Sequence, residues 1–458
     1  MLSGSHSPPL GMFEKSGHDV AKEGMTEILP VSKSKTPRGN YKILIVQGDW
    51  ECGMRRVALD LIDAGHHVSK VVFCASDYIY RLYDIRTHSY RASLAEFADW
   101  LRDLIDREGY DTLFLYNHYR PYNQIAWDLA HELDINCHVF ELGLIRPNCV
   151  TVFERRSFPI SSIPAAWQRV LEDELSPVQH SLPPALCQVS TPAKLSRFIT
   201  SFLFSRLTAR LFPNFVDQRE MNLSHHIKHG AIHLYRFFER RYDRSYDALF
   251  SGELSGNYYA VPLQVHSDTQ ILRCSSFKSI ESFIKKVVDS FAGHAPPGTK
   301  LVFKVHPMDR GYKDYTDLVH GLNDELGGER LIYVDRVHLP TLLNHALGVV
   351  NINSSVGLSG LVHHAPVIAL GDAVYDLPEL TFQGTLDDFW NHAERPCERR
   401  VKQFLNLLLD LNQGRGTLSQ QCFDVPGRSR IQWPKVFQET FFPETSGIKQ
   451  SDHFEKAG

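Results

Sequence analysis

The sequence predicts an α/β protein with two successive domains, each built around a parallel β-sheet. Short apolar runs alternate with stretches of helical period between residues 41 and 140, which is the pattern of βαβ units. The same alternation returns between residues 258 and 370. The chain has 458 residues, more than one hydrophobic core usually organises. We therefore expect two Rossmann-like domains in tandem.

The first block begins with the apolar run YKILIVQGDW, which predicts a strand that turns at Gly48. Each further strand is a short apolar run, and each helix places apolar residues three or four positions apart. The elements expected next are a helix near 56–62, a strand at 67–73, a helix at 94–104, a strand at 112–116, a helix at 124–132 and a strand at 136–140. The last strand delivers ELGLIRP to the carboxyl edge of the sheet, where ligands of such folds gather.

The second block shows the same two periods. Its expected elements are strands at 258–263, 300–305, 331–334, 348–352 and 367–370, and helices at 278–292, 314–325, 339–347, 357–363 and 398–411. The last helix is amphipathic and closes the second domain.

Composition shifts set the expected boundaries. Residues 1–38, rich in Ser, Gly, Pro and Lys, predict a disordered tail. The N-terminal Rossmann-like domain covers 39–250 and includes a helical insertion or connector at about 157–250, where the alternation fails. The C-terminal Rossmann-like domain with its closing helix covers 251–412. A polar tail with little periodicity is expected at 413–458.

Charge and cysteine content exclude several classes of protein. The 49 basic and 53 acidic residues give a net charge of -4, so no overall basic surface favours nucleic acid as a partner. The eight cysteines form no CxxC or CxxH pair, which favours a reducing cytoplasm over a zinc or redox motif. We find no signal peptide and no apolar run long enough to span a membrane.

The segment VPLQVHSDTQI carries polar side chains directly after a predicted strand: Gln264, His266, Asp268 and Gln270. An aspartate at this edge suits a nucleophile or charge stabiliser toward an anomeric carbon. The structural alternative is a cap for the following helix.

The segment LVFKVHPMD places Lys304 and His306 at the end of the next predicted strand. A fixed cation and an imidazole suit a departing phosphate. The alternative is a solvated lysine and a histidine that holds a loop.

A third strand ends at Asn353, Ser354 and Ser355, and Gly357 lets another group approach the helix that follows. The free amides at a helix N-terminus bind anions, although either serine is equally suited to an ordinary N-cap. The chain has neither GxGxxG after its first strand nor a Walker loop, so the usual dinucleotide and P-loop motifs are absent.

In FELGLIRP, Glu141 and Arg146 lie at the expected edge of the first sheet. Glu141 could serve as acid and base toward an acceptor hydroxyl, and Arg146 could grip a sugar carboxylate. A Glu–Arg ion pair that braces the loop is the alternative.

Taken in order, GDWECGMRR, FELGLIRP, VPLQVHSDTQ, KVHP and NSSVGLSGLVHHAPVIALGDAVYD resemble the capsule polysaccharide biosynthesis family of β-Kdo transferases of the KpsS and LipB type. The resemblance covers residues 41–390. It implies a GT-B fold, in which two Rossmann-like domains face each other across a cleft, with an acceptor domain first and a nucleotide-sugar domain second.

The resemblance also implies a retaining glycosyltransferase that moves β-Kdo from CMP-Kdo to a lyso-phosphatidylglycerol-type lipid terminus. By analogy Asp268 is the nucleophile and Glu141 the acid/base, while His306, Lys304, Ser354 and Ser355 lie beside the CMP phosphate. Gln264, Gln270, Asn353, Gly357 and Arg146 complete the expected substrate-binding set. No metal or other cofactor is expected, because Arg146, Lys304 and the helix N-terminus supply positive charge for the anionic donor.

The expected partners are the sugar nucleotide, a lipid acceptor and capsule assembly or export proteins. The segment KLSRFITSFLFSRLTARLF at 194–212 has four basic residues and no acid, which suits attachment to the inner face of an anionic membrane. A core helix with snorkelling arginines is the alternative. Two other functions stay open: a non-catalytic glycolipid-binding or export assembly protein, and a GT-B transferase or epimerase that uses a UDP-sugar.

Overall fold

The computed structural model of the chain describes residues 39–47, 53–78, 85–146, 148–154, 162–172, 200, 204, 207–216, 244–266, 271, 275–310, 312–419, 421 and 423–443. The tail expected at 1–38 and most of the connector expected at 157–250 lie outside these residues. Within the connector, the described helices are α4 (Ile163–Glu172), α7 (Arg244–Ser251) and the short turn η4 (Ala209–Leu211).

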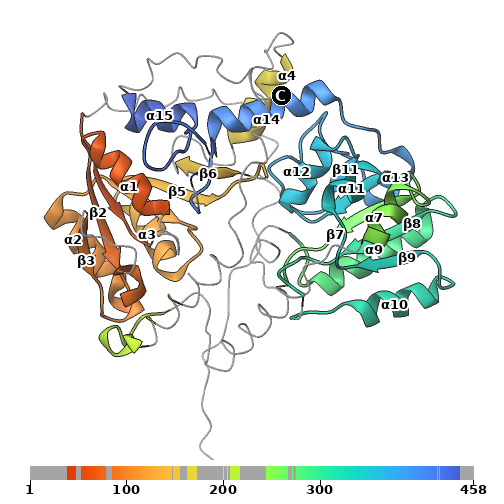
Figure 1. Cartoon of the computed structure of the whole chain (residues 1–458), viewed down its shortest axis with the longest axis horizontal. Coiled ribbons are helices and arrows are strands. Elements are labelled where there is room, and N and C mark those ends of the chain that lie inside the picture. Colours follow the sequence, from red (N-terminus) through yellow and green to blue (C-terminus); the bar gives the residue numbers. More distant parts are fainter. Residues whose placement is uncertain are drawn as a thin grey trace, which may run out of the picture. The chain divides into compact units, whose positions relative to one another are not determined.

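The first sheet has seven strands in the order β12-β6-β5-β4-β1-β2-β3 (Figure 1). Five of them run parallel: β1 (Lys42–Ile45), β2 (His67–Val72), β3 (Arg86–Ser89), β4 (Thr112–Tyr116) and β5 (Asn136–Leu142). The helices of this block are α1 (Gly53–Asp63), α2 (Phe97–Glu108) and α3 (Pro121–Glu132). The strand β6 (Cys149–Glu154) pairs antiparallel with β5, and the sequence analysis did not predict it.

The second sheet has five parallel strands in the order β11-β10-β7-β8-β9 (Figure 1). These are β7 (Tyr258–Pro262), β8 (Lys300–Lys304), β9 (Leu331–Val334), β10 (Gly348–Asn351) and β11 (Val367–Ala369). All five match predicted strands. Their residues are almost continuously apolar, because helices cover both faces of a parallel sheet. The two Rossmann-like sheets confirm the predicted α/β fold class.

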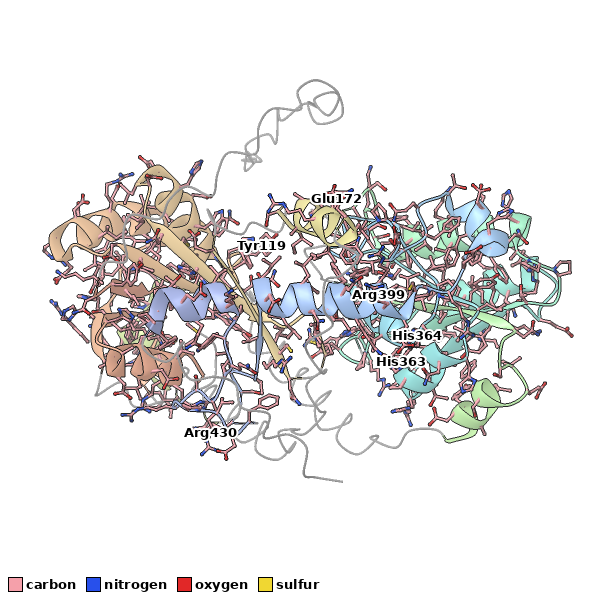
Figure 2. All side chains as sticks on the ribbon, turned by 90° about the horizontal axis from the view of Figure 1, so that it is seen from above. Tyr119, Glu172, His363, His364, Arg399 and Arg430 are labelled. Carbon is pink, nitrogen blue, oxygen red and sulfur yellow. The ribbon has the colours of Figure 1, made fainter. Side chains whose placement is uncertain are left out.

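The first four helices of the second block lie in the connections between its strands, and the last two follow β11. They are α9 (Ile280–His294), α10 (Thr316–Glu325), α11 (Leu339–Asn344), α12 (Ser355–Val362), α13 (Leu386–His392) and α14 (Glu398–Leu411). The helix α14 packs against α12 and α4. His363 and His364 follow α12, and Arg399 lies on α14 (Figure 2). Burial lowers the pKa of His363, and the neighbouring His364 and His338 lower it further.

The expectation of a polar tail from residue 413 is wrong for residues 413–443. The strand β12 (Gln413–Arg415) pairs antiparallel with β6, so the chain returns to the first sheet. The helix α15 (Lys435–Phe441) follows. Trp433, Phe437 and Phe441 are buried in one cluster with Phe114 and Phe140 of the first sheet. Their spacing of four residues is a helical period, and it is the signal that the sequence analysis missed.

The side chain of Gln413 joins this returning segment to the loop after β5. Its Oε1 atom accepts a hydrogen bond from the Leu144 backbone amide at 2.8 Å, and its Nε2 atom donates to Thr151 Oγ1 at 2.9 Å. Gln413 is almost completely buried, and a buried amide is stable only when its polar atoms are paired. The C-terminal segment therefore supports the loop that carries ELGLIRP.

Candidate functional site

The carboxyl ends of three neighbouring strands, β8, β7 and β10, carry most of the predicted site of the second sheet. Gln264, after β7, and Asn353, after β10, bind each other twice. The Gln264 Nε2 atom donates to Asn353 Oδ1 at 3.0 Å, and the backbone amide of Asn353 donates to Gln264 Oε1 at 3.2 Å. The structure therefore brings these two predicted residues together, and it fixes the loop that leads into α12.

Lys304 is the last residue of β8, and its side chain is only 8% exposed. Its Nζ atom has one hydrogen bond, of 3.4 Å, to the Val305 carbonyl, and no carboxylate within the described part of the chain forms an ion pair with it. Burial lowers the pKa of Lys304 to about 8; the charge of Arg310 adds to this effect and Asp335 opposes it. A buried ammonium without a counter-ion is costly unless an anion joins it.

His306 begins a tight turn directly after β8. Its carbonyl accepts a hydrogen bond from the Asp309 amide at 2.9 Å, and its Nδ1 atom accepts one from the Met308 amide at 3.1 Å. Because Nδ1 is an acceptor, the neutral ring carries its proton on Nε2. This tautomer makes His306 a hydrogen-bond donor at Nε2, as a phosphate ligand requires.

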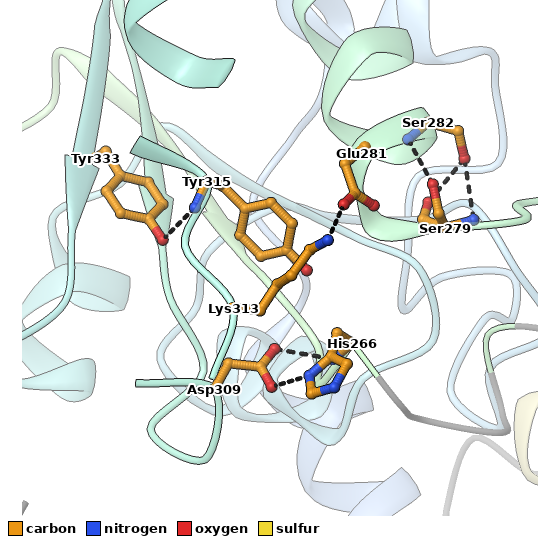
Figure 3. A network of polar contacts seen from close by, with 8 residues as sticks. All are labelled: His266, Ser279, Glu281, Ser282, Asp309, Lys313, Tyr315 and Tyr333. Atoms are coloured by element: carbon orange, nitrogen blue, oxygen red, sulfur yellow. Dashed lines mark hydrogen bonds and ion pairs between the residues drawn. The ribbon is translucent and has the colours of Figure 1, made fainter. Parts of the chain in front are cut away.

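A second histidine, His266, is held by Asp309 of the same turn (Figure 3). Asp309 accepts the His266 backbone amide at 2.8 Å and lies 2.6 Å from its Nδ1 atom. The sequence analysis noted His266 but did not assign it to the site, and it missed Asp309. The available signal was HPMD, in which an acidic residue follows His306 by one turn.

The N-terminus of α12 is capped by its own chain. Ser354 Oγ accepts the Val356 amide at 3.2 Å, and the Gly357 amide donates to the Ser354 carbonyl at 2.9 Å. Ser354 is therefore the N-cap of α12, and its expected place beside the CMP phosphate stays a prediction. A Cβ atom on Gly357 would lie 2.1 Å from Tyr375 Oη, so the group that approaches this glycine closely is a buried tyrosine. Ser355 is the first residue of α12.

On the first sheet, Glu141 lies near the end of β5 and pairs with His118, which follows β4. The distance between His118 Nδ1 and Glu141 Oε1 is 3.2 Å. The His118 ring packs against Tyr119 (Figure 2) and Trp127, with centroids 3.8 and 5.1 Å away. Sequence reasoning missed His118, although it follows a predicted strand directly.

Arg146 is exposed. The Glu141–Arg146 ion pair, offered as the structural alternative for this loop, does not occur between the described side chains.

Asp268 and Gln270 lie outside the residues that the structure describes. No group of three or more His, Cys, Asp or Glu side chains with metal-binding geometry occurs in the described ranges, and the expectation of a metal-independent site stays a prediction.

Comparison with known proteins places this site in a family context. Residues 111–417 match the family model described as "Capsule polysaccharide biosynthesis protein". The chain is 33% identical to the capsule polysaccharide modification protein LipB of Neisseria meningitidis serogroup A over 390 residues, which cover 83% of this chain and 92% of LipB. It is 33% identical to the capsule polysaccharide export protein KpsS of Escherichia coli, over 80% of this chain and 94% of KpsS.

Among solved structures, the β-Kdo 2,7 transferase of Thermosulfurimonas dismutans KpsC aligns with a TM-score of 0.38 and 15% identity, over 82% of this chain and 92% of that one. The two sequence relatives and the family match each cover most of this chain. The chain therefore belongs to the capsule polysaccharide biosynthesis protein family.

Proposed function

We propose that this chain is a retaining glycosyltransferase that moves β-Kdo from CMP-Kdo to a lyso-phosphatidylglycerol-type lipid terminus in capsule biosynthesis. The observation that carries the proposal is Lys304, a buried lysine at a strand end with no carboxylate paired to it among the described residues. Such a charge is stabilised when an anionic ligand enters. A sugar nucleotide supplies that anion.

The surroundings of Lys304 support a phosphate rather than an apolar ligand. His306, two residues further along the chain, has the tautomer that donates from Nε2. Charge-assisted hydrogen bonds to phosphate oxygens are roughly twice as strong as neutral ones. Together these groups stabilise the negative charge that develops on the CMP phosphate as its bond to the sugar breaks.

The remaining chemistry is assigned by family resemblance. Asp268 attacks the anomeric carbon and CMP leaves, which forms a glycosyl–enzyme ester. The acceptor hydroxyl then attacks the same carbon, its proton passes to Glu141, and the ester bond to Asp268 breaks. The contact between His118 and Glu141 supports this role, because it orients the carboxylate that receives the proton.

We also propose that the protein works at the inner face of the membrane, where a lipid acceptor is available. The segment expected to bind lipid is described only in part. There Leu207 and Leu211 are 83% and 53% exposed, and Arg210 lies between them in the sequence. Apolar side chains beside a cation suit an anionic bilayer surface. None of the described helices is both long and apolar enough to cross a membrane.

The proposal is tested with purified protein, CMP-Kdo and synthetic lyso-phosphatidylglycerol. Mass spectrometry should find one or more Kdo units on the lipid, and CMP should be released only when the lipid is present. Asp268→Asn should abolish transfer while the protein stays folded, whereas Asp324→Asn on the exposed face of α10 should leave transfer unchanged. Full transfer by Asp268→Asn would reject the nucleophile.

A second candidate is a non-catalytic glycolipid-binding protein of capsule export, because the E. coli relative KpsS is named a capsule polysaccharide export protein. Such a protein binds the glycolipid product but has no need of a sugar nucleotide. Binding of the lipid without any turnover of CMP-Kdo would favour this candidate. Preferential binding of UDP over CMP would instead point to a UDP-sugar enzyme.

A further inference from the structure

The His266–Asp309 pair joins an exposed imidazole to a buried carboxylate. Asp309 is 1% exposed, whereas the His266 side chain is 42% exposed. Both carboxylate oxygens act as acceptors: Oδ2 receives the His266 backbone amide, and Oδ1 faces Nδ1 of the same residue. Because a carboxylate can only accept, an ionised Asp309 requires the tautomer of His266 that carries its hydrogen on Nδ1. The other ring nitrogen, Nε2, is then the one that remains to bind a ligand.

The opposite end of the ring is available to a ligand. Within the described ranges, Nε2 of His266 makes no hydrogen bond. A buried carboxylate behind an imidazole, with the second nitrogen directed outward, is the arrangement that orients catalytic and ligand-binding histidines elsewhere. The His266 side chain is 42% exposed while Asp309 is buried, so the ring is accessible from the side away from the carboxylate.

The same turn that holds His266 also holds His306. Asp309 donates its amide to the His306 carbonyl and accepts from His266 through its side chain. The two rings follow the neighbouring parallel strands β7 and β8, whose residues Pro262 and Lys304 are register partners. One short turn therefore positions two imidazoles at the edge where Lys304 has no anionic partner among the described residues.

We propose that His266 is a phosphate-binding residue of the donor site, with Asp309 as the residue that positions it. Nε2 of the doubly protonated ring donates a hydrogen bond to the nucleotide phosphate, and Asp309 balances the charge from the other side. This inference rests on the donor proposed above, a cytidine monophosphate sugar. An imidazolium between two anions is stabilised by both, so binding of the phosphate is accompanied by proton uptake.

The neighbouring charges decide the conditions of the test. The charged and titratable groups on β8, the following turn, β9 and α9 are Lys304, His306, Arg310, Asp335, Tyr333, Lys313, Glu281 and Tyr315. Arg310 and Asp335 act on Lys304, Tyr315 interacts with Asp309, and Figure 3 draws the last four residues. Lys304 has a pKa of about 8, so at pH 6.5 it is already protonated and contributes no uptake. The phosphate of CMP also changes its protonation near this pH, so the His266 contribution is obtained by comparing variants.

The experiment is calorimetry of CMP binding at pH 6.5 in two buffers of different ionisation enthalpy, which reports the protons taken up. The wild-type protein should bind CMP with uptake, and cytidine much more weakly. His266→Gln should weaken CMP binding roughly 10- to 100-fold, the usual effect of losing a hydrogen bond to a charged group, and should reduce the uptake. Asp309→Asn should do the same to a smaller extent. His320→Gln, an exposed histidine on α10, should match the wild type.

The outcomes separate this inference from the proposed function. If wild-type protein does not bind CMP, the proposed donor is wrong and the role of His266 falls with it. If wild-type protein binds CMP and His266→Gln keeps both affinity and uptake, only the role of His266 is wrong. An equal loss of cytidine binding would also overturn it, since a phosphate contact leaves the nucleoside unaffected. Glycerol phosphate tests whether the phosphate that His266 binds belongs to the lipid acceptor. If His266→Gln loses binding of glycerol phosphate but keeps binding of CMP, the assignment to the nucleotide is wrong.

Discussion

Replacing Gly357 by alanine tests how the tip of α12 is built. The new Cβ atom would lie 2.1 Å from Tyr375 Oη and 2.7 Å from Asn351 Nδ2. Tyr375 is 2% exposed, and its hydroxyl donates to Asn351 Oδ1 at 2.8 Å and contacts the Ser354 carbonyl. The ring cannot move aside without breaking these contacts, so the substitution forces a local rearrangement.

The size of the effect follows from opposing terms. Overpacking a buried site costs about 1–3 kcal/mol, and a buried hydrogen-bonding group left unpaired costs about 1–3 kcal/mol more. Alanine returns up to about 1 kcal/mol through its higher helix propensity. We expect Gly357→Ala to lower the free energy of unfolding by about 1–5 kcal/mol, and to weaken CMP binding because the α12 N-terminus shifts.

The matched control is Gly321→Ala in the middle of α10, where a Cβ atom meets nothing within 4 Å. This change should raise the free energy of unfolding by about 0.5–1 kcal/mol. Urea unfolding followed by fluorescence measures both variants. Equal stability of Gly357→Ala and wild type would refute the packing argument.

Three further changes test other parts of the site and fold. Lys304→Met should weaken CMP binding at pH 7 at least 10-fold, because a charged hydrogen bond contributes about 1.5–3 kcal/mol. In the wild type, CMP affinity should fall as the pH rises through about 8, because Lys304 then loses its proton while CMP keeps its double charge. Binding titrations of Lys304→Met between pH 7 and 9 should lack this decline. Glu141→Gln should slow Kdo transfer about 10²- to 10⁴-fold with unchanged CMP affinity, and equal rates would reject its acid/base role. Trp433→Ala should cost about 3–5 kcal/mol of stability in urea unfolding, and a negligible cost would show that the returning segment adds nothing to the first core.

The elements that the sequence predicted best are those with one clear period. The strands β4 and β9 and the helix α14 begin and end at the predicted residues. The strand β6 was missed because it pairs antiparallel with β5 after a short loop, whereas the alternation had led us to expect a helix before each new strand. The strand β12 has only three residues, too few to show any period.

The sequence predicted which residues follow the strands at one sheet edge, but not how their side chains pair. Gln264 and Asn353 were expected at one edge because the ends of parallel strands meet there, and they do. The pairing of His266 with Asp309, and of Glu141 with His118, depends on the relative register of two strands. That register is set by tertiary packing and leaves no trace in a local sequence window.

The return of the C-terminal segment to the first sheet has a consequence for biosynthesis. Because β12 is made long after β6, the outer edge of β6 stays unpaired while more than two hundred residues are made, those of the connector and of the second sheet with its helices. An open edge is a site of mispairing. A deletion that removes β12 would therefore disturb the first sheet, and a shortened gene that stops after α14 would leave the outer edge of β6 without its partner strand.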